Sequence, residues 1–198
     1  MKEKTTMELV TLCGSVRRDS CNAALLRALP GLAPGDLKFI DGPSVADVPI
    51  YDADLERVSG FPSVVTSLAN SLREADGVVI ASPEYNYSVP GGLKNLLDWI
   101  SRVPDQPLAG KPVLIQSVSG GAMGGVRMQH HLRQILVCLN ARTFARPEVS
   151  IGTAGQNFDE AGMLIDKATR AAVRAQIDAF ADFVREAGIV ERHMSGRP

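Results

Sequence analysis

Residues that bind metals or form disulfides are scarce in this chain. Cysteine and histidine each occur three times, and Cys13, Cys21 and Cys138 show no C-x-x-C spacing. This pattern predicts neither a disulfide framework nor a zinc site. His130 and His131 are neighbours on an expected helix, where consecutive side chains point about 100° apart. We therefore expect no bound metal.

A large excess of one charge and a long apolar run are also absent. The net charge of −1 gives no reason to expect a nucleic acid or a membrane surface as partner. No stretch approaches the length of a membrane span, and the first residues lack the apolar segment of a secretory signal. We expect a cytoplasmic protein with a single domain over residues 1–198 and a frayed tail at about 191–198.

Two common phosphate-binding loops are missing. No Gly-Lys-Ser or Gly-Lys-Thr occurs, which excludes the P-loop of nucleoside triphosphatases. The first expected strand is not followed by G-x-G-x-x-G, and the glycine-rich run at 120–125 does not match that spacing. The main sign of a dinucleotide-binding Rossmann domain is therefore absent.

The sequence does contain a polar loop between the first expected strand, at 9–12, and the first expected helix, at 23–29. This loop offers a glycine for a tight turn, two hydroxyls, an amide and a forked cation: Gly14, Ser15, Ser20, Asn22 and Arg17. At a helix N-terminus such a loop favours a terminal phosphate, and FMN carries one. The alternative is an ordinary turn in which Ser20 is the N-cap.

Strands alternate with helices along the chain. Apolar runs predict strands at 9–12, 37–40, 77–81 and 112–118, and a fifth at 142–150 that is broken by Pro147. Apolar residues at helical spacing predict helices at 23–29, 62–73, 92–101 and 167–186, and another after the glycine run. Residues 41–54 are expected to be a loop. This alternation predicts an α/β, flavodoxin-like three-layer sandwich, with a five-stranded parallel sheet in the order 2-1-3-4-5.

Three loops of unusual composition follow strands 1, 3 and 4, at 14–22, 83–91 and 118–125. In the expected order these strands are neighbours, so the loops meet at one edge of the sheet. Pro83 and Pro90 stiffen the second loop, which can then present fixed N–H and C=O groups to a flat heterocycle such as a flavin. The alternative is a rigid surface turn in which Tyr85 and Tyr87 only pack.

Two motifs together resemble the NADPH-dependent FMN reductase family. One is Gly14-Ser15-x-Arg17-x-x-Ser20-x-Asn22, and the other begins at Pro83-Glu84-Tyr85-Asn86 and ends at Asp98-Trp99. The similarity covers about residues 9–185 and is closest to the soluble quinone and chromate reductase branch. The resemblance implies a flavodoxin-like fold, non-covalently bound FMN, and NADPH or NADH as the hydride donor.

The resemblance implies cofactor-binding residues in three groups. In the first loop, Gly14 belongs to the cofactor site, and the phosphate contacts come from Ser15, Arg17, Ser20 and Asn22. The isoalloxazine ring is lined, largely by backbone, at Pro83, Glu84, Tyr85 and Asn86. The third loop closes the other side of the ring at Ser117, Gly120 and Gly121. A flexible connection is the alternative for the glycines.

The resemblance also implies the chemistry and the assembly. Hydride passes from NAD(P)H to the flavin, and electrons then pass by a ping-pong mechanism to quinones, metal oxyanions such as chromate, or related small acceptors. Because the flavin carries this chemistry, no catalytic side chain is expected. Arg18 is a candidate for the 2′-phosphate of NADPH, and a solvated arginine is the alternative. The family implies a homo-oligomer, expected here to be a tetramer assembled as a dimer of dimers, with Arg127 and Glu148 near a subunit contact.

Three other functions are alternatives to the reductase. The Cys-x5-Arg loop of low-molecular-weight tyrosine phosphatases does not fit, because Asp19 stands where the arginine would follow Cys13. A flavodoxin-type electron carrier or a flavin redox sensor would use the same fold. Carriers usually have a strongly acidic surface, which the net charge of −1 does not indicate.

Overall fold

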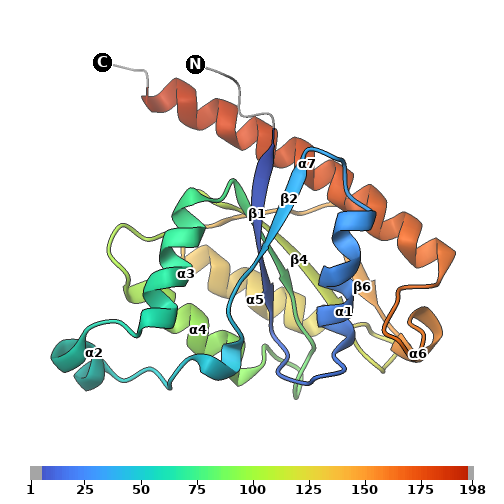
Figure 1. Ribbon diagram of the computed structural model, residues 1–198, viewed down its shortest axis with the longest axis horizontal. Helices are drawn as coiled ribbons and strands as arrows, with labels where there is room; N and C mark the ends of the chain where they lie inside the picture. Colours follow the sequence, from blue (N-terminus) through green and yellow to red (C-terminus); the bar gives the residue numbers. More distant parts are fainter. Residues whose placement is uncertain (1–5, 196–198) are drawn as a thin grey trace.

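The computed structural model describes residues 6–195, with side chains up to residue 188. Its centre is a parallel sheet built from β1 (Met7–Cys13), β2 (Leu37–Asp41), β3 (Gly77–Ala81), β4 (Pro112–Val118), β5 (Arg142–Thr143) and β6 (Val149–Ile151). The strand order is β2-β1-β3-β4-β5, and β6 also pairs with β4 (Figure 1). The predicted order and the flavodoxin-like three-layer architecture are confirmed.

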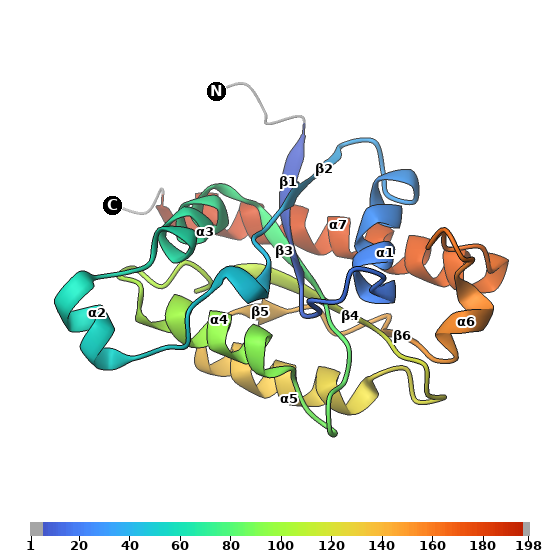
Figure 2. The same cartoon turned by 60° about the horizontal axis from the view of Figure 1, so that its bottom comes forward.

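Helices cover both faces of the sheet (Figure 2). On one face lie α1 (Cys21–Ala28) and α7 (Lys167–Ser195), which pack against Leu9 and Leu114. On the other lie α3 (Ser63–Glu74), α4 (Gly91–Arg102) and α5 (Val126–Cys138), which pack against Val10 and Leu12. Leu9 and Val10 are adjacent and both buried, which is why the strands read as continuous apolar runs.

The predicted fifth strand at 142–150 is wrong as one element. It is divided into β5 and β6, and residues 145–148 between them are exposed. Pro147 has no N–H to donate to a neighbouring strand, so the ladder is interrupted there. Phe144 instead turns into the core, where its ring lies 5.6 Å from that of Phe180.

The expectation of a plain loop at 41–54 is also wrong. This stretch contains a 3-10 turn, η2 (Val45–Asp47), and the start of α2 (Ala53–Ser59). None of the α2 residues is buried, so apolar spacing could not reveal this helix. Its local signal is Asp52, whose carboxylate accepts hydrogen bonds from the N–H groups of Asp54 and Leu55.

Side chains of α4 hold this stretch in place. Trp99 Nε1 donates to the carbonyl of Pro49 at 2.8 Å, and Asn95 Oδ1 accepts from the N–H of Tyr51 at 2.8 Å. The Tyr51 hydroxyl donates to Glu56 Oε2 at 2.9 Å, and this bond to a carboxylate raises the pKa of Tyr51. Two residues of the second motif, Asn95 and Trp99, therefore serve the fold.

Three short helical segments were not predicted: η1 (Leu29–Gly31), η2 and α6 (Ala154–Asn157). The last helix is longer than predicted, because α7 continues past Glu186 to Ser195 with Gly188 inside it. The expected frayed tail is therefore helical at 191–195, and residues 196–198 lie outside the described residues. Among the described residues, no helix combines the length and the apolar character needed to cross a membrane.

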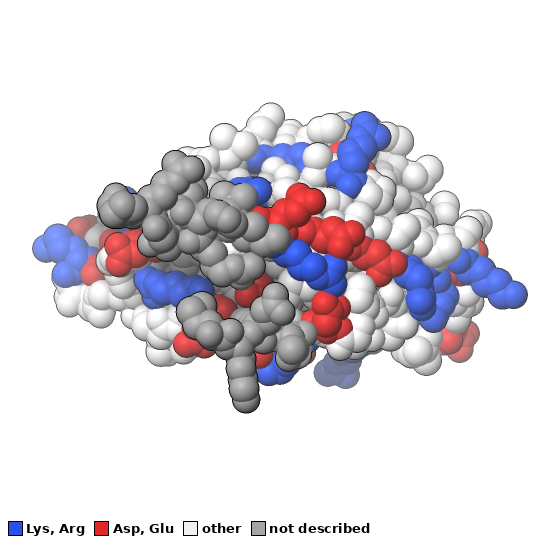
Figure 3. Space-filling model, turned by 90° about the horizontal axis from the view of Figure 1, so that it is seen from above, with Lys and Arg blue, Asp and Glu red and all other residues white. Residues whose placement is uncertain are grey.

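The end of the sheet where the strands begin has a mixed surface. Figure 3 views this end and shows lysine and arginine interspersed with aspartate and glutamate. Among the described residues, Arg185 forms ion pairs with Asp36 at 2.7 Å and with Asp182 at 2.6 Å. The Arg185 guanidinium lowers the pKa of Asp36 through this hydrogen bond. On this face the charges compensate one another.

Candidate functional site

The loops that follow β1, β3 and β4 meet at the opposite end of the sheet. The N–H of Gly14 donates to the carbonyl of Ala81 at 2.9 Å, and the N–H of Ser82 donates to the carbonyl of Gln116 at 3.1 Å. These bonds continue the sheet beyond the strand ends, so the three loops start side by side. The predicted juxtaposition is confirmed, because β3 lies between β1 and β4.

The first loop leads into the N-terminus of α1. Ser20 Oγ accepts from the N–H of Ala23 at 3.3 Å, so Ser20 is the N-cap of α1. Ser15 Oγ accepts from the N–H of Arg17 at 3.3 Å. In both serines the hydroxyl acts as an acceptor, which leaves its hydrogen to donate to a ligand. Arg17 is exposed, and its Nη2 donates to the carbonyl of Asp19 at 3.3 Å.

Asn22 has a structural task inside this loop. Its side chain is buried, with Nδ2 donating to the carbonyl of Val118 and Oδ1 accepting from the N–H of Val118, both at 2.9 Å. The amide therefore ties α1 to the end of β4. The N–H groups of Cys21 and Asn22 lie in the first turn of the helix, where no intrahelical acceptor exists.

We expect Asn22→Ala to destabilise the protein even without a ligand. The change removes two hydrogen bonds and leaves the buried N–H and C=O of Val118 unpaired, a loss of about 2–3 kcal/mol. Urea unfolding of the apo-protein measures it. An unchanged midpoint would mean that Asn22 contributes only to ligand binding.

The second loop reaches its tip in a two-residue turn. The N–H of Tyr85 donates to the carbonyl of Ser88 and the N–H of Ser88 to that of Tyr85, each at 3.0 Å. Asn86 and Tyr87, between them, have φ of 47° and 69°. Both are left-handed residues without the freedom of glycine. The loop therefore has one defined backbone conformation.

The side chain of Glu84 points toward α5. Its Oε2 accepts from the N–H groups of Arg127 and Met128 at 3.1 and 3.3 Å, and its Oε1 accepts from Arg127 Nη1 at 3.2 Å. The carboxylate thus caps the N-terminus of α5, which favours a negative charge. Pro83 is half-buried, whereas Tyr85, Asn86 and Tyr87 are exposed.

The third loop is held from behind by a buried polar network. Ser117 Oγ donates to the carbonyl of Gly124 at 2.6 Å and accepts from Gln129 Nε2 at 2.7 Å. Gln129 also donates to the carbonyl of Val149 at 2.8 Å. Because the Ser117 hydroxyl hydrogen is already used, its side chain supports the loop and does not face a ligand. Gly120 and Gly121 are exposed at the loop surface.

Gln129 was not identified as a site residue from sequence. Its spacing to Leu132 and Leu136 is helical and all three are buried, so periodicity places it on the core side of α5. A buried amide there must find partners, which is the signal that could have drawn attention to it. A Cβ on Gly124 would lie 2.7 Å from the Ser150 carbonyl carbon, so the loop passes close to β6.

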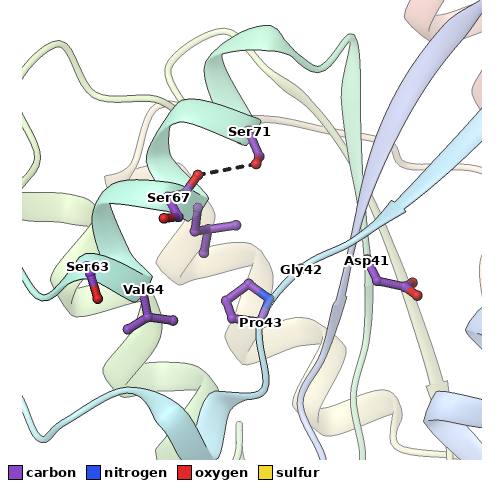
Figure 4. Close-up of a pocket in the computed structure, with 8 residues that line it drawn as sticks. Asp41, Gly42, Pro43, Ser63, Val64, Ser67 and Ser71 are labelled. Atoms are coloured by element: carbon purple, nitrogen blue, oxygen red, sulfur yellow. Dashed lines mark hydrogen bonds between the residues drawn. The ribbon is translucent and has the colours of Figure 1, made fainter.

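One surface hollow lies away from these loops. A cavity of about 380 Å³ lies between the end of β2 and α3, lined by Asp41, Gly42, Pro43, Ser63, Val64, Ser67, Leu68 and Ser71 (Figure 4). Ser71 Oγ donates to the carbonyl of Ser67 at 3.2 Å. Asp41 Oδ1 accepts from Thr11 Oγ1 at 2.9 Å. The carboxylate is thus occupied within the fold, and we assign the hollow no part in the site.

Comparison with known proteins identifies the family. Residues 7–156 match the NADPH-dependent FMN reductase family. The chain belongs to this family. As a member it is an oxidoreductase that uses FMN and NAD(P)H. The resemblance inferred from the two motifs is confirmed, and the phosphatase, electron-carrier and redox-sensor alternatives are set aside.

Relatives and solved structures of FMN reductases agree with this assignment. The chain is 50% identical over 190 residues to the quinone reductase of Escherichia coli (strain K12), covering 96% of this chain and 100% of that protein. It is 39% identical over 179 residues to an NAD(P)H-dependent FMN reductase of Pseudomonas aeruginosa, covering 90% and 96%. The NAD(P)H:(acceptor) oxidoreductase FerB of Paracoccus denitrificans matches with a TM-score of 0.83 at 30% identity, covering 92% and 99%.

The residues of this FMN reductase suit the cofactor. The first loop combines free helix N–H groups, two serine hydroxyls and an exposed arginine, which is a donor set for a phosphate. The second and third loops start beside the first, at the carboxyl ends of the neighbouring strands β3 and β4. When bound, FMN accepts a hydride from NAD(P)H and passes electrons onward.

Proposed function

We propose that this FMN reductase is an NAD(P)H-dependent quinone reductase that works by a ping-pong mechanism in the cytoplasm. The observation that carries the acceptor class is the 50% identity with the quinone reductase of Escherichia coli over 96% of this chain. A further relative, 37% identical over 181 residues, is a 2-hydroxy-1,4-benzoquinone reductase of a Burkholderia species. Chromate and other metal oxyanions are proposed as additional acceptors.

Within this proposal the loops divide the work of binding FMN. The phosphate is held by the backbone of Gly14, the hydroxyls of Ser15 and Ser20, the Arg17 guanidinium and the N–H of Asn22. The backbone of residues 83–86 orients the flavin ring, and the loop at 119–121 covers its other side. No side chain acts as acid or base, because these groups supply only position and charge.

Exposed apolar side chains border the proposed site and offer the acceptor a surface to pack against. Val16, Tyr85, Tyr87 and Met123, all from the three loops, are each at least 45% exposed. A flat apolar quinone ring gains free energy by covering such surface. A charged oxyanion gains nothing from these contacts, so we expect quinones to have the lower KM.

The proposal is tested by absorption spectroscopy and steady-state kinetics. The purified protein should show flavin bands that NADPH or NADH bleaches under anaerobic conditions, and adding a benzoquinone should restore them. Double-reciprocal plots at several quinone concentrations should be parallel, as ping-pong kinetics requires. Bleached bands that a benzoquinone fails to restore would overturn the acceptor assignment.

We further propose that the chain assembles into a tetramer, built as a dimer of dimers, with α5 at a subunit contact. The most exposed residues of α5 are His130, His131, Gln134, Val137 and Cys138, with no lysine, arginine, aspartate or glutamate among them. Val137 is 71% exposed. Depletion of charge together with an exposed apolar residue is typical of the centre of an interface.

Arg127 and Glu148 are poor reporters of this contact. Each has an ion-pair partner within the chain: Arg127 pairs with Glu84 at 3.2 Å, and Glu148 pairs with Arg133 at 3.1 Å. Reversing either charge would disturb these pairs as well as any contact between subunits. A substitution at Val137, an exposed apolar residue of α5, tests the subunit contact without disturbing these ion pairs.

We expect Val137→Arg to lower the mass measured by sedimentation or light scattering, because a buried unpaired charge opposes association. Met163→Arg, on an exposed apolar residue in another part of the chain, is the control and should leave the mass unchanged. A wild-type particle that stays at the monomer mass of 21.2 kDa at high concentration would refute the assembly.

A further inference from the structure

The turn at the tip of the second loop adopts a conformation that Tyr87, its second central residue, disfavours. Left-handed φ at two consecutive positions is normally supplied by Asn-Gly, which has no side chain at the second position. Here the second residue is Tyr87, with φ of 69°. Such backbone strain persists only where surrounding contacts maintain it.

Arg127 supplies those contacts. Its guanidinium lies 4.1 Å from the centre of the Tyr87 ring, a cation–π geometry. The same guanidinium donates to Glu84 Oε1, so one side chain contacts the residue before the turn and a residue inside it. A third contact joins Ser88 Oγ and His131 Nδ1 at 3.0 Å. The loop is thus fixed to α5.

Arg127 also compensates a charge beside the site. The Glu84 carboxylate is only 13% exposed, and its charge is balanced by Arg127 and by the N-terminus of α5. Two-electron reduction adds negative charge to a flavin, which a nearby uncompensated carboxylate opposes. The pairing therefore favours the reduced cofactor.

We propose that Arg127 is a positioning residue for the redox reaction. It holds residues 84–88 in the conformation that faces the flavin ring and compensates the charge of Glu84 there. This inference rests on the proposed placement of the ring against the second loop. It assigns Arg127 a task within one subunit, separate from the subunit contact proposed for α5.

The test compares Arg127→Met with Arg133→Met. Methionine keeps an unbranched apolar side chain and removes the charge. Arg133 lies on the same helix, also pairs with a carboxylate, and makes no hydrogen bond or ion pair to the second loop among the described residues. Two quantities are measured: hydrogen exchange at the amides of Tyr85 and Ser88 in the apo-protein, and the dissociation constants of oxidised and reduced FMN.

In Arg127→Met we expect both amides to exchange faster. We also expect a fall in the affinity ratio, which is the affinity for reduced FMN divided by the affinity for oxidised FMN. Reduced FMN should bind about tenfold more weakly relative to oxidised FMN, which for a two-electron couple is about 30 mV toward more negative potential. Arg133→Met should change neither quantity. Adding Glu84→Gln to Arg127→Met removes the uncompensated charge and should restore the affinity ratio, while the amides still exchange fast.

Three other outcomes would each overturn a stated part of this proposal. Unchanged exchange in Arg127→Met overturns the inference and leaves the proposed flavin site standing. Faster exchange with an unchanged affinity ratio overturns the inference together with the ring placement, because the loop would then not contact the flavin. A double variant with the same ratio as Arg127→Met overturns the charge compensation.

Discussion

Replacing Arg17 by alanine should weaken FMN binding by about 10- to 100-fold. A charge-assisted hydrogen bond contributes about 1.5–3 kcal/mol, and every 1.4 kcal/mol is a factor of ten in affinity. Arg17 is exposed, and its guanidinium has one described partner, the carbonyl of Asp19. Its removal therefore costs the fold little. Fluorescence titration of the apo-protein with FMN measures the effect.

Riboflavin and Arg18 provide the controls for Arg17. Riboflavin lacks the phosphate, so its affinity should be nearly equal in the wild type and in Arg17→Ala. Arg18→Ala removes a neighbouring exposed arginine and should leave the FMN affinity unchanged. If the affinities for FMN and riboflavin fall together, Arg17 supports the shape of the loop and does not bind the phosphate.

Gly14→Ala should abolish most FMN binding and lower stability. A Cβ on Gly14 would lie 2.7 Å from Ser82 Cβ, still closer to its Oγ, and 3.1 Å from Leu93. Ser82 is fully buried, so the first and second loops must move apart to admit the methyl group. Forcing extra volume into a packed site typically costs about 1–3 kcal/mol. Thermal unfolding and FMN titration are the measurements.

The contact between Gly14 and Ser82 is tested by a compensating change. Ser82→Gly in the Gly14→Ala background removes the clashing side chain and should restore much of the lost FMN affinity. Gly31→Ala is the stability control, because nothing lies within 4 Å of a Cβ built there. Failure of Ser82→Gly to recover any affinity would show that the alanine acts through the backbone of Gly14.

The parts of the fold that depend on chain-local patterns were predictable. The strands at 77–81 and 112–118 have the predicted bounds, because parallel strands covered on both faces are continuous apolar runs. By contrast, α2 buries nothing and α6 is a single turn, so neither has an apolar periodicity to detect. Pro147 indicated a break in the last strand, but the sequence did not show that the break extends from residue 144 to residue 148.

The sequence by itself determined the family, the sheet order and the edge of the sheet at which the three loops meet. The sheet order follows from the alternation of apolar strands and helices. The family follows from two motifs, each made of several residues at fixed spacing. The site residues themselves remain a prediction.

Only the tertiary structure decided how side chains of the motifs are used. Asn22, Ser117, Asn95 and Trp99 make buried or partly buried hydrogen bonds within the fold, most of them to backbone groups distant in sequence. Glu84 reaches Arg127 across 43 residues of sequence. A buried polar group must be paired, and its partner is set by three-dimensional packing, which residue spacing does not encode.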